Sequence, residues 1–520
     1  MVKEYLNYSR ASDVKDPYER VLYRFLEMVP GLLAWLTLGA VVVLSFIIPV
    51  WMAIFIITFN VYWLLKTIYL STHLRISFNR VRRNMDVNWF ERLQKIQPEQ
   101  ITVPNVFRWQ DVRHLVFLPT YKEEEAVIAS TLNGLKNTEY SKEALIVVLA
   151  QEQRAGREHN DRIRSFVESQ FGNVFGRLVF VEHPGDIVGE LAGKGSNIAW
   201  AGKYVDREIM PELGQPAEAV LVSALDIDTV VYPQYFACLT ATYLTTKDPL
   251  HASYQPVPFY LNNIWDAPAM ARISAFSTTF WQTVKQEQPE SMITYSSHSM
   301  PYTALRDVGF WQTNMVSEDS RIFWQCLLYY DGHYRVEPLY YPVSMDANLA
   351  ESYWRTMLNV YKQQRRWGYG AENFPYFTFG FIKNKKMPFA RRLHYFLVML
   401  EGTWSWSTNA IMLFLLGWLP ILAGGAAFNT TVLSFNLPYM TRFMMTFAMF
   451  GLITSAVTSS VVLPVRPERH GKLRHAFMFL QWLLFPVKSI AFGALPALEA
   501  QTRLMLGKYM GFWVTPKARK

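Results

Sequence analysis

Residues 220–228 read Val-Leu-Val-Ser-Ala-Leu-Asp-Ile-Asp, an apolar run that ends in two acids. The run is short and continuous, which predicts a buried strand. Asp226 and Asp228 follow its carboxyl end, and residues two apart on an extended chain point to the same side. Hard divalent cations prefer paired carboxylates of this kind. The stretch therefore predicts a cation-binding strand end, with an ordinary solvated turn as the alternative.

Three further apolar runs precede this strand, at residues 115–119, 145–150 and 177–181. Stretches with helical spacing lie between them, such as residues 124–135. Continuous apolar strands that alternate with helices are typical of a mostly parallel sheet buried on both faces. Because ligands bind such sheets outside the carboxyl ends of the strands, we expect the site there.

The composition describes a chain that is partly membrane-embedded. Among 520 residues, 51% are hydrophobic and 18% are charged, below the roughly 25% of average soluble domains. This excludes a disordered or acidic solvating protein. A mean hydropathy of +0.05 nevertheless indicates a sizeable water-facing part. Two cysteines cannot form a disulfide framework.

Four apolar stretches are long enough for a bilayer, which needs about 20 helical residues: 29–48, 50–70, 404–427 and 439–463. Pro49 marks the turn of the first pair, and the uncharged stretch 428–438 is the expected loop of the second. A cleaved signal peptide fits less well, because a long polar segment precedes the first stretch and a second apolar run follows it.

Basic residues flank these stretches on the side expected to be cytoplasmic. The region 73–392 should then be cytosolic. The last apolar segment, 475–496, has basic residues at both ends and a proline inside it. We expect an interfacial or re-entrant helix pair there, with a fifth span as the alternative.

Glu318 and Asp319 form a second acidic pair, before an apolar helix expected over residues 322–330. Two adjacent acids favour a helix N-terminus in any protein. The functional interpretation is a general base with its neighbour in support.

Gln363-Gln364-Arg365-Arg366-Trp367 is a third motif. Helical spacing places Gln363 and Trp367 on one face. Arg366 offers a fork for phosphate oxygens, and Trp367 offers a flat surface for a sugar ring. The alternative is an amphipathic helix on anionic lipid, and both interpretations are compatible. Lys194, between two glycines, is a weak signal alone and is not part of a Walker motif.

The order and spacing of these motifs resemble the membrane-embedded, processive branch of glycosyltransferase family 2, which includes cellulose, hyaluronan and chitin synthases. The resemblance covers residues 105–375. It adds the loop Pro119-Thr120-Tyr121-Lys122-Glu123 and the segment Gly193-Lys194 to the acidic pairs and to the segment 363–367. The C-terminal stretch 512–517 also looks like the gating loop of cellulose-synthase-like enzymes, with Phe512, Val514, Thr515 and Lys517 at the matching positions.

The resemblance implies a GT-A-like domain and a role for each matching residue. Asp319 is implied as the catalytic base with Glu318 beside it, Asp228 and Asp226 as ligands of Mg²⁺ or Mn²⁺, and Trp367 as the acceptor platform. The donor would contact Thr120, Tyr121, Glu123, Gln151, Lys194, Asp226, Gln363 and Arg366. Lys122, Ser317 and Gln151 stand where the family usually has Asn, Thr and an acid, which leaves uridine specificity open.

The function implied is an inverting transfer of a sugar from a nucleotide-diphosphate sugar, with UDP favoured, to a growing polysaccharide or other glycan through a β-linkage. The alternative is a single transfer to a lipid-linked acceptor. An inactive sugar-nucleotide sensor and a transporter are the other classes weighed. We expect a cell (inner) membrane protein with a cytosolic catalytic domain, a homo-oligomer or export subunit as possible partners, and no nucleic acid.

The expected organisation has six parts. These are a cytosolic segment 1–28, a transmembrane hairpin 29–72, a cytosolic GT-A domain 73–350, amphipathic interface helices 351–403, two transmembrane helices 404–464, and a cytosolic loop with interfacial helices and the gating-like segment 465–520.

Overall fold

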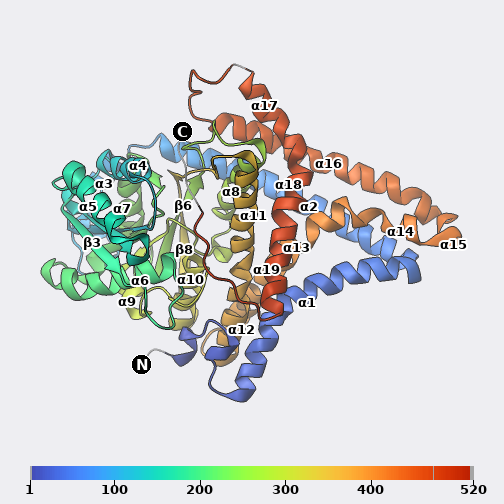
Figure 1. The fold of residues 1–520 in the computed structure, drawn as a ribbon, viewed down its shortest axis with the longest axis horizontal. Coiled ribbons are helices and arrows are strands. Elements are labelled where there is room, and N and C mark those ends of the chain that lie inside the picture. The colour runs from blue at the N-terminus through green and yellow to red at the C-terminus, as the bar shows by residue number, and fades with distance from the viewer. Residues whose placement is uncertain (1–2, 472, 516–520) are drawn as a thin grey trace.

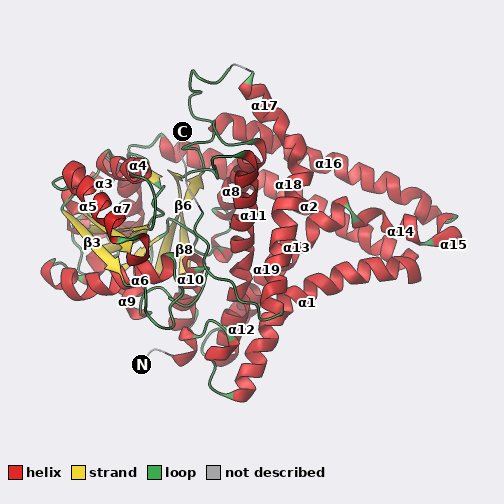
Figure 2. Cartoon of the chain, viewed as in Figure 1, coloured by secondary structure: helices red, strands yellow, loops and turns green. Residues whose placement is uncertain are grey.

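The computed structural model describes residues 3–471 and 473–515. A sheet with its covering helices forms one side of the molecule, and long helices extend away from it on the other side (Figures 1 and 2). A layer of helices that includes α8 (Ala269–Lys285), α11 (Tyr353–Gly368) and α19 (Leu495–Met505) lies between the two.

The sheet has eight strands in the order β3-β2-β1-β4-β7-β6-β8-β5. Strands β3, β2, β1 and β4 run parallel, as the four apolar runs predicted. The bounds are β1 Arg113–Thr120, β2 Leu145–Glu152, β3 Arg177–His183, β4 Val220–Ala224, β5 Val230–Val231, β6 Ala252–Phe259, β7 Ser299–Pro301 and β8 Arg335–Ser344.

Alternate residues of the parallel strands enter two different cores. Leu115 and Phe117 of β1 pack against α6 (Lys194–Tyr204), α9 (Tyr302–Asp307) and α10 (Glu318–Tyr329). Val116 and Leu118 enter the opposite core, with α4 (Glu125–Lys136), α5 (Arg157–Phe171) and α7 (Tyr235–Thr245). The predicted α/β class with a mostly parallel sheet is therefore confirmed.

The other half of the sheet is mixed and was not predicted. β7 pairs antiparallel with both β4 and β6, β6 pairs parallel with β8, and β5 pairs antiparallel with β8. β5 and β7 contain two and three residues, which is too short to form a recognisable apolar run. This half carries the turns after β6 and β8 to the same edge as the end of β4.

The first predicted hairpin is present with its turn at Pro49. α1 (Pro17–Ile47) ends at Ile48, and α2 (Pro49–Met85) begins with the proline. Both helices are longer than the predicted 29–48 and 50–70. The Asp16 side chain accepts a hydrogen bond from the Glu19 N–H and so starts α1 early. Polar turns extend each helix beyond its apolar stretch, which hydropathy alone does not reveal.

The helices that contain the later predicted spans have different bounds from those stretches. α13 (Phe389–Phe414) begins well before residue 404, and then bends by 54° towards the short helix α14 (Leu419–Ala423). α16 (Val432–Val462) includes most of the loop expected over 428–438. The Thr431 side chain caps its first turn by accepting from the Ser434 N–H.

The described chain has four helices long and apolar enough to cross a membrane, or five if the bent pair is one span. One of the four runs from Arg474 to Met505 and contains α17 (Arg474–Leu480), α18 (Phe485–Ser489) and α19. Figure 1 shows this run crossing the direction of α1, α2 and α16. The choice between an interfacial pair and a fifth span stays a prediction.

The remaining helices are shorter. They are α3 Trp89–Gln94, α12 Asn373–Lys383 and α15 Gly425–Asn429.

Candidate active site

Asp228, the second acid after β4, is surrounded by groups from the turns after β6 and β8. Asp228 is buried, and its Oδ2 accepts the Asp346 backbone N–H at 3.2 Å. The Asn262 amide donates to the Asp228 carbonyl at 3.0 Å and to Asp346 Oδ1 at 2.8 Å. The turns after β6 and β8 thus bring a further carboxylate, Asp346, beside the strand end. Sequence reasoning missed Asp346 because no motif marks it.

Lys194 joins the two predicted acidic pairs. Its ammonium nitrogen lies 2.6 Å from Asp226 Oδ1, and 2.8 and 3.0 Å from the two oxygens of Asp319. Burial opposes the charged form of Lys194, yet the carboxylates of Asp226, Asp319 and Glu318 raise its pKa above the ordinary value. Residues from β4, α6 and α10 therefore share one charged centre at the carboxyl edge of the sheet.

Glu318 and Asp319 are themselves the first residues of α10, which was expected to begin at residue 322. Glu318 is 1% exposed, and its Oε1 has no hydrogen-bond partner among the described residues. Burial and the neighbouring Asp319 charge raise the pKa of Glu318 from 4.5 to about 8. The raised pKa favours the neutral form of Glu318 at pH 7.

A buried carboxylate holds the turn before this acidic pair. Glu372 Oε1 accepts hydrogen bonds from the Val316 N–H, the Ser317 N–H and the Ser317 hydroxyl at 2.8–3.0 Å. Burial raises the pKa of Glu372, and these hydrogen bonds and Arg321 act in the opposite direction. The contacts fix the N-terminus of α10, and so the position of Asp319. Glu372 has no sequence signal of its own, apart from following the 363–367 motif closely.

His298 also lies at this centre and was not predicted. It is fully buried, its Nδ1 donates to the Tyr295 carbonyl at 2.9 Å, and the same nitrogen lies 4.0 Å from Asp319 Oδ1. Burial lowers the pKa of His298, so the ring is neutral at pH 7. A neutral imidazole leaves Lys194 as the cation that pairs with Asp319.

The residues implied for the nucleoside lie at the ends of β1 and β2. Thr120 is buried, and the Tyr121 N–H donates to Glu123 Oε2 at 2.7 Å. The Tyr121 ring also lies 5.2 Å from the Arg154 guanidinium. These contacts shape a polar rim next to the charged centre.

Gln151 is placed differently from the other predicted donor contacts. Its amide nitrogen donates to the Asn160 carbonyl at 3.0 Å, inside the fold. The neighbouring Glu152 pairs with Arg154, and burial raises the Glu152 pKa while Arg154 opposes the rise. Glu152 interacts electrostatically with Glu123. Glu152 thus places an acid at the end of β2, one residue after the position where the family usually has one.

The C-terminal segment packs against α11 and against Gly193, the residue before Lys194. The Arg366 guanidinium lies 4.9 Å from the Phe512 ring centroid, and Lys362 lies 5.4 Å from that of Trp513. A side chain at Gly193 would meet Phe512 at 2.5 Å, so only glycine allows this approach. Val514 and Thr515 continue the segment, and Lys517 lies outside the described residues.

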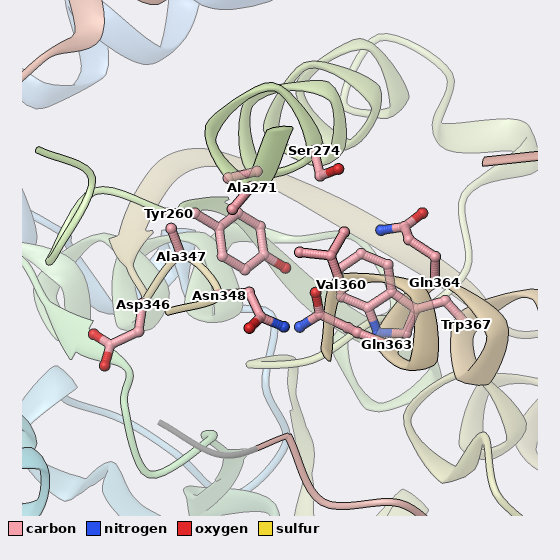
Figure 3. A pocket seen from close by; sticks show the side chains of 11 residues that line it. Tyr260, Ala271, Ser274, Asp346, Ala347, Asn348, Val360, Gln363, Gln364 and Trp367 are labelled. Carbon is pink, nitrogen blue, oxygen red and sulfur yellow. The ribbon is translucent and has the colours of Figure 1, made fainter. Parts of the chain in front are cut away.

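Gln363 and Trp367 lie on one face of α11, as predicted, and line a hollow next to the carboxylates (Figure 3). Tyr260, after β6, lines the hollow and interacts electrostatically with Asp226, Asp228 and Asp319. Burial and the charges of Asp226 and Asp228 raise the Tyr260 pKa above its ordinary value. The site thus has a charged part at the sheet edge and a neutral part under α8 and α11.

The carboxylates at this edge of the sheet supply only some of the ligands that a hard cation needs. Within residues 3–471 and 473–515, no group of three or more His, Cys, Asp or Glu side chains is placed to hold a metal ion. Asp228 and Asp346 are nevertheless neighbouring oxygen donors. Mg²⁺ commonly takes one or two carboxylates and completes its shell with substrate phosphates and water. The residues fit an ion that a diphosphate helps to hold.

Residues 221–463, a little under half of the chain, match the family described as Glycosyl transferase family group 2. This region is similar to the catalytic domain of glycosyltransferase family 2. The match begins inside β4 and includes both acidic pairs and the 363–367 motif. The part of the family resemblance that concerns this domain is therefore confirmed.

Two curated relatives, both poly-β-1,6-N-acetyl-D-glucosamine synthases of Staphylococcus epidermidis, are 26% and 25% identical over 217 residues. Each match covers 41% of this chain and 47% of the relative. The chain thus spans about half the length of the curated relatives it matches.

Similar solved structures include mannosyltransferase PcManGT from Pyrobaculum calidifontis, in complex with GDP-Man and Mn²⁺, at 15% identity and a TM-score of 0.40. That match covers 77% of this chain and 98% of the other. S. aureus TarS 1–349 with UDP-GlcNAc follows at 13% identity, a TM-score of 0.35, and coverage of 68% and 93%.

Proposed function

We propose that this protein is a membrane-embedded, inverting glycosyltransferase that transfers a sugar from a nucleotide-diphosphate sugar to a growing polysaccharide. The observation that carries the proposal is the position of Lys194 between Asp226 and Asp319. It brings a donor-binding acid and a candidate base to one point at the carboxyl edge of the sheet, where open α/β sheets bind their ligands.

The donor's diphosphate would lie between Lys194 and Arg366. Arg366 sits under Phe512, and Lys194 follows Gly193, which Phe512 also contacts. Two cations that face one small volume offset the charge that develops on a leaving diphosphate. The nucleoside would extend towards Tyr121 and Glu152, at the ends of β1 and β2.

Asp319 would take the proton from an acceptor hydroxyl while that oxygen attacks the anomeric carbon. The new C–O bond forms as the bond from the anomeric carbon to the diphosphate oxygen breaks, and the nucleoside diphosphate leaves with the electron pair. A single displacement inverts the anomeric centre, so an α-linked donor gives a β-linked product. The raised pKa of Glu318 favours its neutral form, which would reduce its repulsion of the Asp319 carboxylate.

A bound Mg²⁺ or Mn²⁺ would neutralise part of the diphosphate charge. Asp228 and Asp346 would supply its protein ligands, with Asp226 held by Lys194. The Asn262 amide, which contacts both residues, keeps the two carboxylates side by side.

The two curated relatives are poly-β-1,6-N-acetyl-D-glucosamine synthases, and this supports a polymer product. The arrangement of the long apolar helices beside α8 and α11 supports a site close to a bilayer (Figure 1). We therefore include UDP-N-acetylglucosamine with UDP-glucose among the donors to test, and propose the cytosolic side of the cell membrane as the location.

The test is release of nucleoside diphosphate by the purified full-length protein in lipid nanodiscs, with Mn²⁺ or Mg²⁺. The panel holds UDP-N-acetylglucosamine, UDP-glucose, UDP-galactose and GDP-mannose. We expect release from at least one donor and its loss with EDTA. No release from any donor contradicts the proposal. Product length by mass spectrometry then separates a polymer from a single sugar on a lipid-linked acceptor.

A further inference from the structure

A basic segment, residues 464–471, follows α16 and is bound to the turn before α8. Asp266 of that turn accepts from Arg469 Nη2 at 2.6 Å, and its other oxygen lies 3.1 Å from His470 Nε2. The indole N–H of Trp265 donates to a carbonyl of the segment at 3.2 Å. These contacts fasten the segment to the catalytic part of the chain, and they engage both oxygens of Asp266.

Arg272, on α8 behind this turn, is a buried cation without a counter-charge. It is 4% exposed, and its guanidinium donates to Gln481 Oε1 at 2.7 Å and to the Ala267 carbonyl at 2.5 Å. Both acceptors are neutral, and no carboxylate of the described residues pairs with Arg272. Burial and the charge of Arg474 lower its pKa to about 10, so the group is still charged at pH 7. A buried charge of this kind destabilises a fold strongly unless an opposite charge joins it.

Two N–H donors beside Arg272 are also unpaired. Gln481 is 5% exposed, and its amide nitrogen has no partner among the described residues, although its oxygen is bound by Arg272. Arg474 donates to the Trp265 carbonyl at 2.9 Å, but its buried Nε has no described partner. Arg474 is only partly buried, so the group of donors reaches the surface through it. Donors and positive charge that lack an acceptor point to an anionic ligand.

Arg321 shows how this fold treats a buried arginine that has a structural role. Its guanidinium donates to Asn373 Oδ1 at 2.6 Å and to Gln312 Oε1 at 2.7 Å. The buried carboxylate of Glu372 interacts with its charge. Arg272 has a similar depth but no such carboxylate. The difference between the two arginines separates a structural role from a binding role.

The surroundings of Arg272 favour a lipid as the source of the anion. α17 begins at Arg474, and its side chains Phe477 and Leu480 are exposed. The run that starts there is apolar enough to cross a membrane. Figure 1 shows α17 beside the end of α16 that lies nearer the sheet. The unpaired donors therefore lie where apolar helices meet the catalytic part of the chain, which is the depth of a lipid head group.

The charge of the cluster favours an anionic head group over a zwitterionic one. The arginines outnumber the acids among the charged residues of the segment and its contacts, which are Arg272, Arg466, Arg469, Arg474, Asp266 and Glu468. Guanidinium groups bind phosphate oxygens in a fork geometry. Basic clusters beside membrane helices are typical sites for anionic head groups. The ammonium group of a zwitterionic lipid would be repelled by the excess of positive charge.

We propose that Arg272, Arg474 and the Gln481 amide bind the phosphate of an anionic lipid head group, in the leaflet on the side of the sheet. The phosphate supplies the counter-charge of Arg272 and accepts from the two unpaired donors. It thereby ties α8 to the start of α17. The site takes no part in sugar transfer, so it stands apart from the proposed function.

The test measures the melting temperature of the full-length protein in nanodiscs. One arm uses phosphatidylcholine alone, a second adds rising fractions of phosphatidylglycerol, and a third adds inorganic phosphate to the phosphatidylcholine nanodiscs. The variants are Arg272→Met, which removes the buried charge, and Gln481→Glu, which places a carboxylate beside it. The matched control is Arg75→Met, the same substitution at an exposed position of α2.

We expect phosphatidylglycerol to raise the melting temperature of the wild type, because a ligand that binds the folded state stabilises it. Inorganic phosphate should have little effect. Arg272→Met should need about tenfold more phosphatidylglycerol for a half-maximal rise, as the loss of one charge-assisted hydrogen bond implies. In phosphatidylcholine alone, Gln481→Glu should melt at a higher temperature than the wild type, and phosphatidylglycerol should add little to it. Arg75→Met should follow the wild type.

Three results overturn the proposal. The first is a wild type that melts at the same temperature with and without phosphatidylglycerol. The second is an equal response of Arg272→Met and Arg75→Met, since general attraction to a charged surface would then explain the rise. The third is a full rise with inorganic phosphate, which would make the ligand a soluble anion. If Arg272→Met does not fold, Gln481→Glu decides: no gain over the wild type in phosphatidylcholine shows that Arg272 needs no counter-charge.

Discussion

The sheet edge and the hollow under α11 differ in how their polar groups are paired. At the sheet edge, Lys194 donates to Asp226 and Asp319. The Val316 and Ser317 N–H groups of the turn before Asp319 donate to Glu372. In the hollow, Asn348 and Ser274 have no partners among the described residues. Ion pairs dominate the first region, where Glu318 Oε1 still has no partner among the described residues. The lining of the second region is neutral apart from Asp346.

The difference indicates what each region is built to bind. A charged centre would be very costly to leave unpaired in a buried place, so its members neutralise one another until a charged ligand arrives. Neutral amides and hydroxyls destabilise the fold less than charges do when they lack hydrogen bonds. They can therefore stay unpaired until a neutral ligand binds. The charged centre therefore suits a charged ligand, and the hollow suits a small uncharged one.

Asp319→Asn should give the largest effect at the charged centre. Losing the base should reduce the rate of diphosphate release by about 10³-fold or more, within the range typical of general acid–base catalysis. Donor KM should change less than threefold, because the amide keeps the shape of the carboxylate. Steady-state release assays measure both. The matched control is Asp161→Asn, an exposed acid on α5, and a rate above a tenth of wild type for Asp319→Asn removes Asp319 from the mechanism.

Lys194→Met should come next, with a loss of about 10²-fold in kcat/KM. The variant removes a cation from the diphosphate and also leaves Asp226 and Asp319 facing each other without it. Lys203→Met, at the exposed end of the same helix, is the control and should behave as wild type. Equal activity of the two variants would mean that Lys194 serves neither the donor nor the acids.

Glu372→Gln tests whether the turn before α10 positions Asp319. The amide can still accept but is a weaker acceptor for the three donors at Val316 and Ser317, so we expect kcat to fall about tenfold with donor KM within twofold. In Glu372→Ala, kcat should fall further. A purely structural role would instead lower the melting temperature of both variants without separating kcat from KM.

Glu318→Gln should have the smallest effect on turnover at pH 7, because the carboxyl is already neutral there. Its effect lies in the pH dependence of stability. The folded-state pKa of about 8 exceeds the unfolded value of 4.5, so the folded protein binds the extra proton between these values. The wild type therefore loses stability as pH rises from 5 to 8.

The variant has no such proton to bind, so its advantage over the wild type should grow by roughly 1–3 kcal/mol across that window. Thermal unfolding at pH 5, 6, 7 and 8 measures it. A stability difference that stays constant with pH would show that Glu318 is charged in the folded protein.

The sequence was enough to predict the parallel half of the sheet, because β1 to β4 are continuous apolar runs that end in polar residues. It was also enough to place Lys194, Asp226 and Asp319 together, through the resemblance. Asp346, Glu372 and Asn348 were missed because tertiary contacts bring them to the site and no local pattern marks them. Helix ends were missed where polar turns extend apolar stretches, as at Pro17 and Met85.

The most direct test of the central claim is a cryo-EM structure of the protein in nanodiscs with Mn²⁺ and the nucleoside diphosphate released in the donor panel. The claim is that both acidic pairs serve one bound molecule. The account predicts density for the diphosphate within hydrogen-bonding distance of Lys194 or Arg366, with Asp228 on one side and Asp319 on the other. A diphosphate bound elsewhere, with Lys194 still joining Asp226 to Asp319, would contradict it.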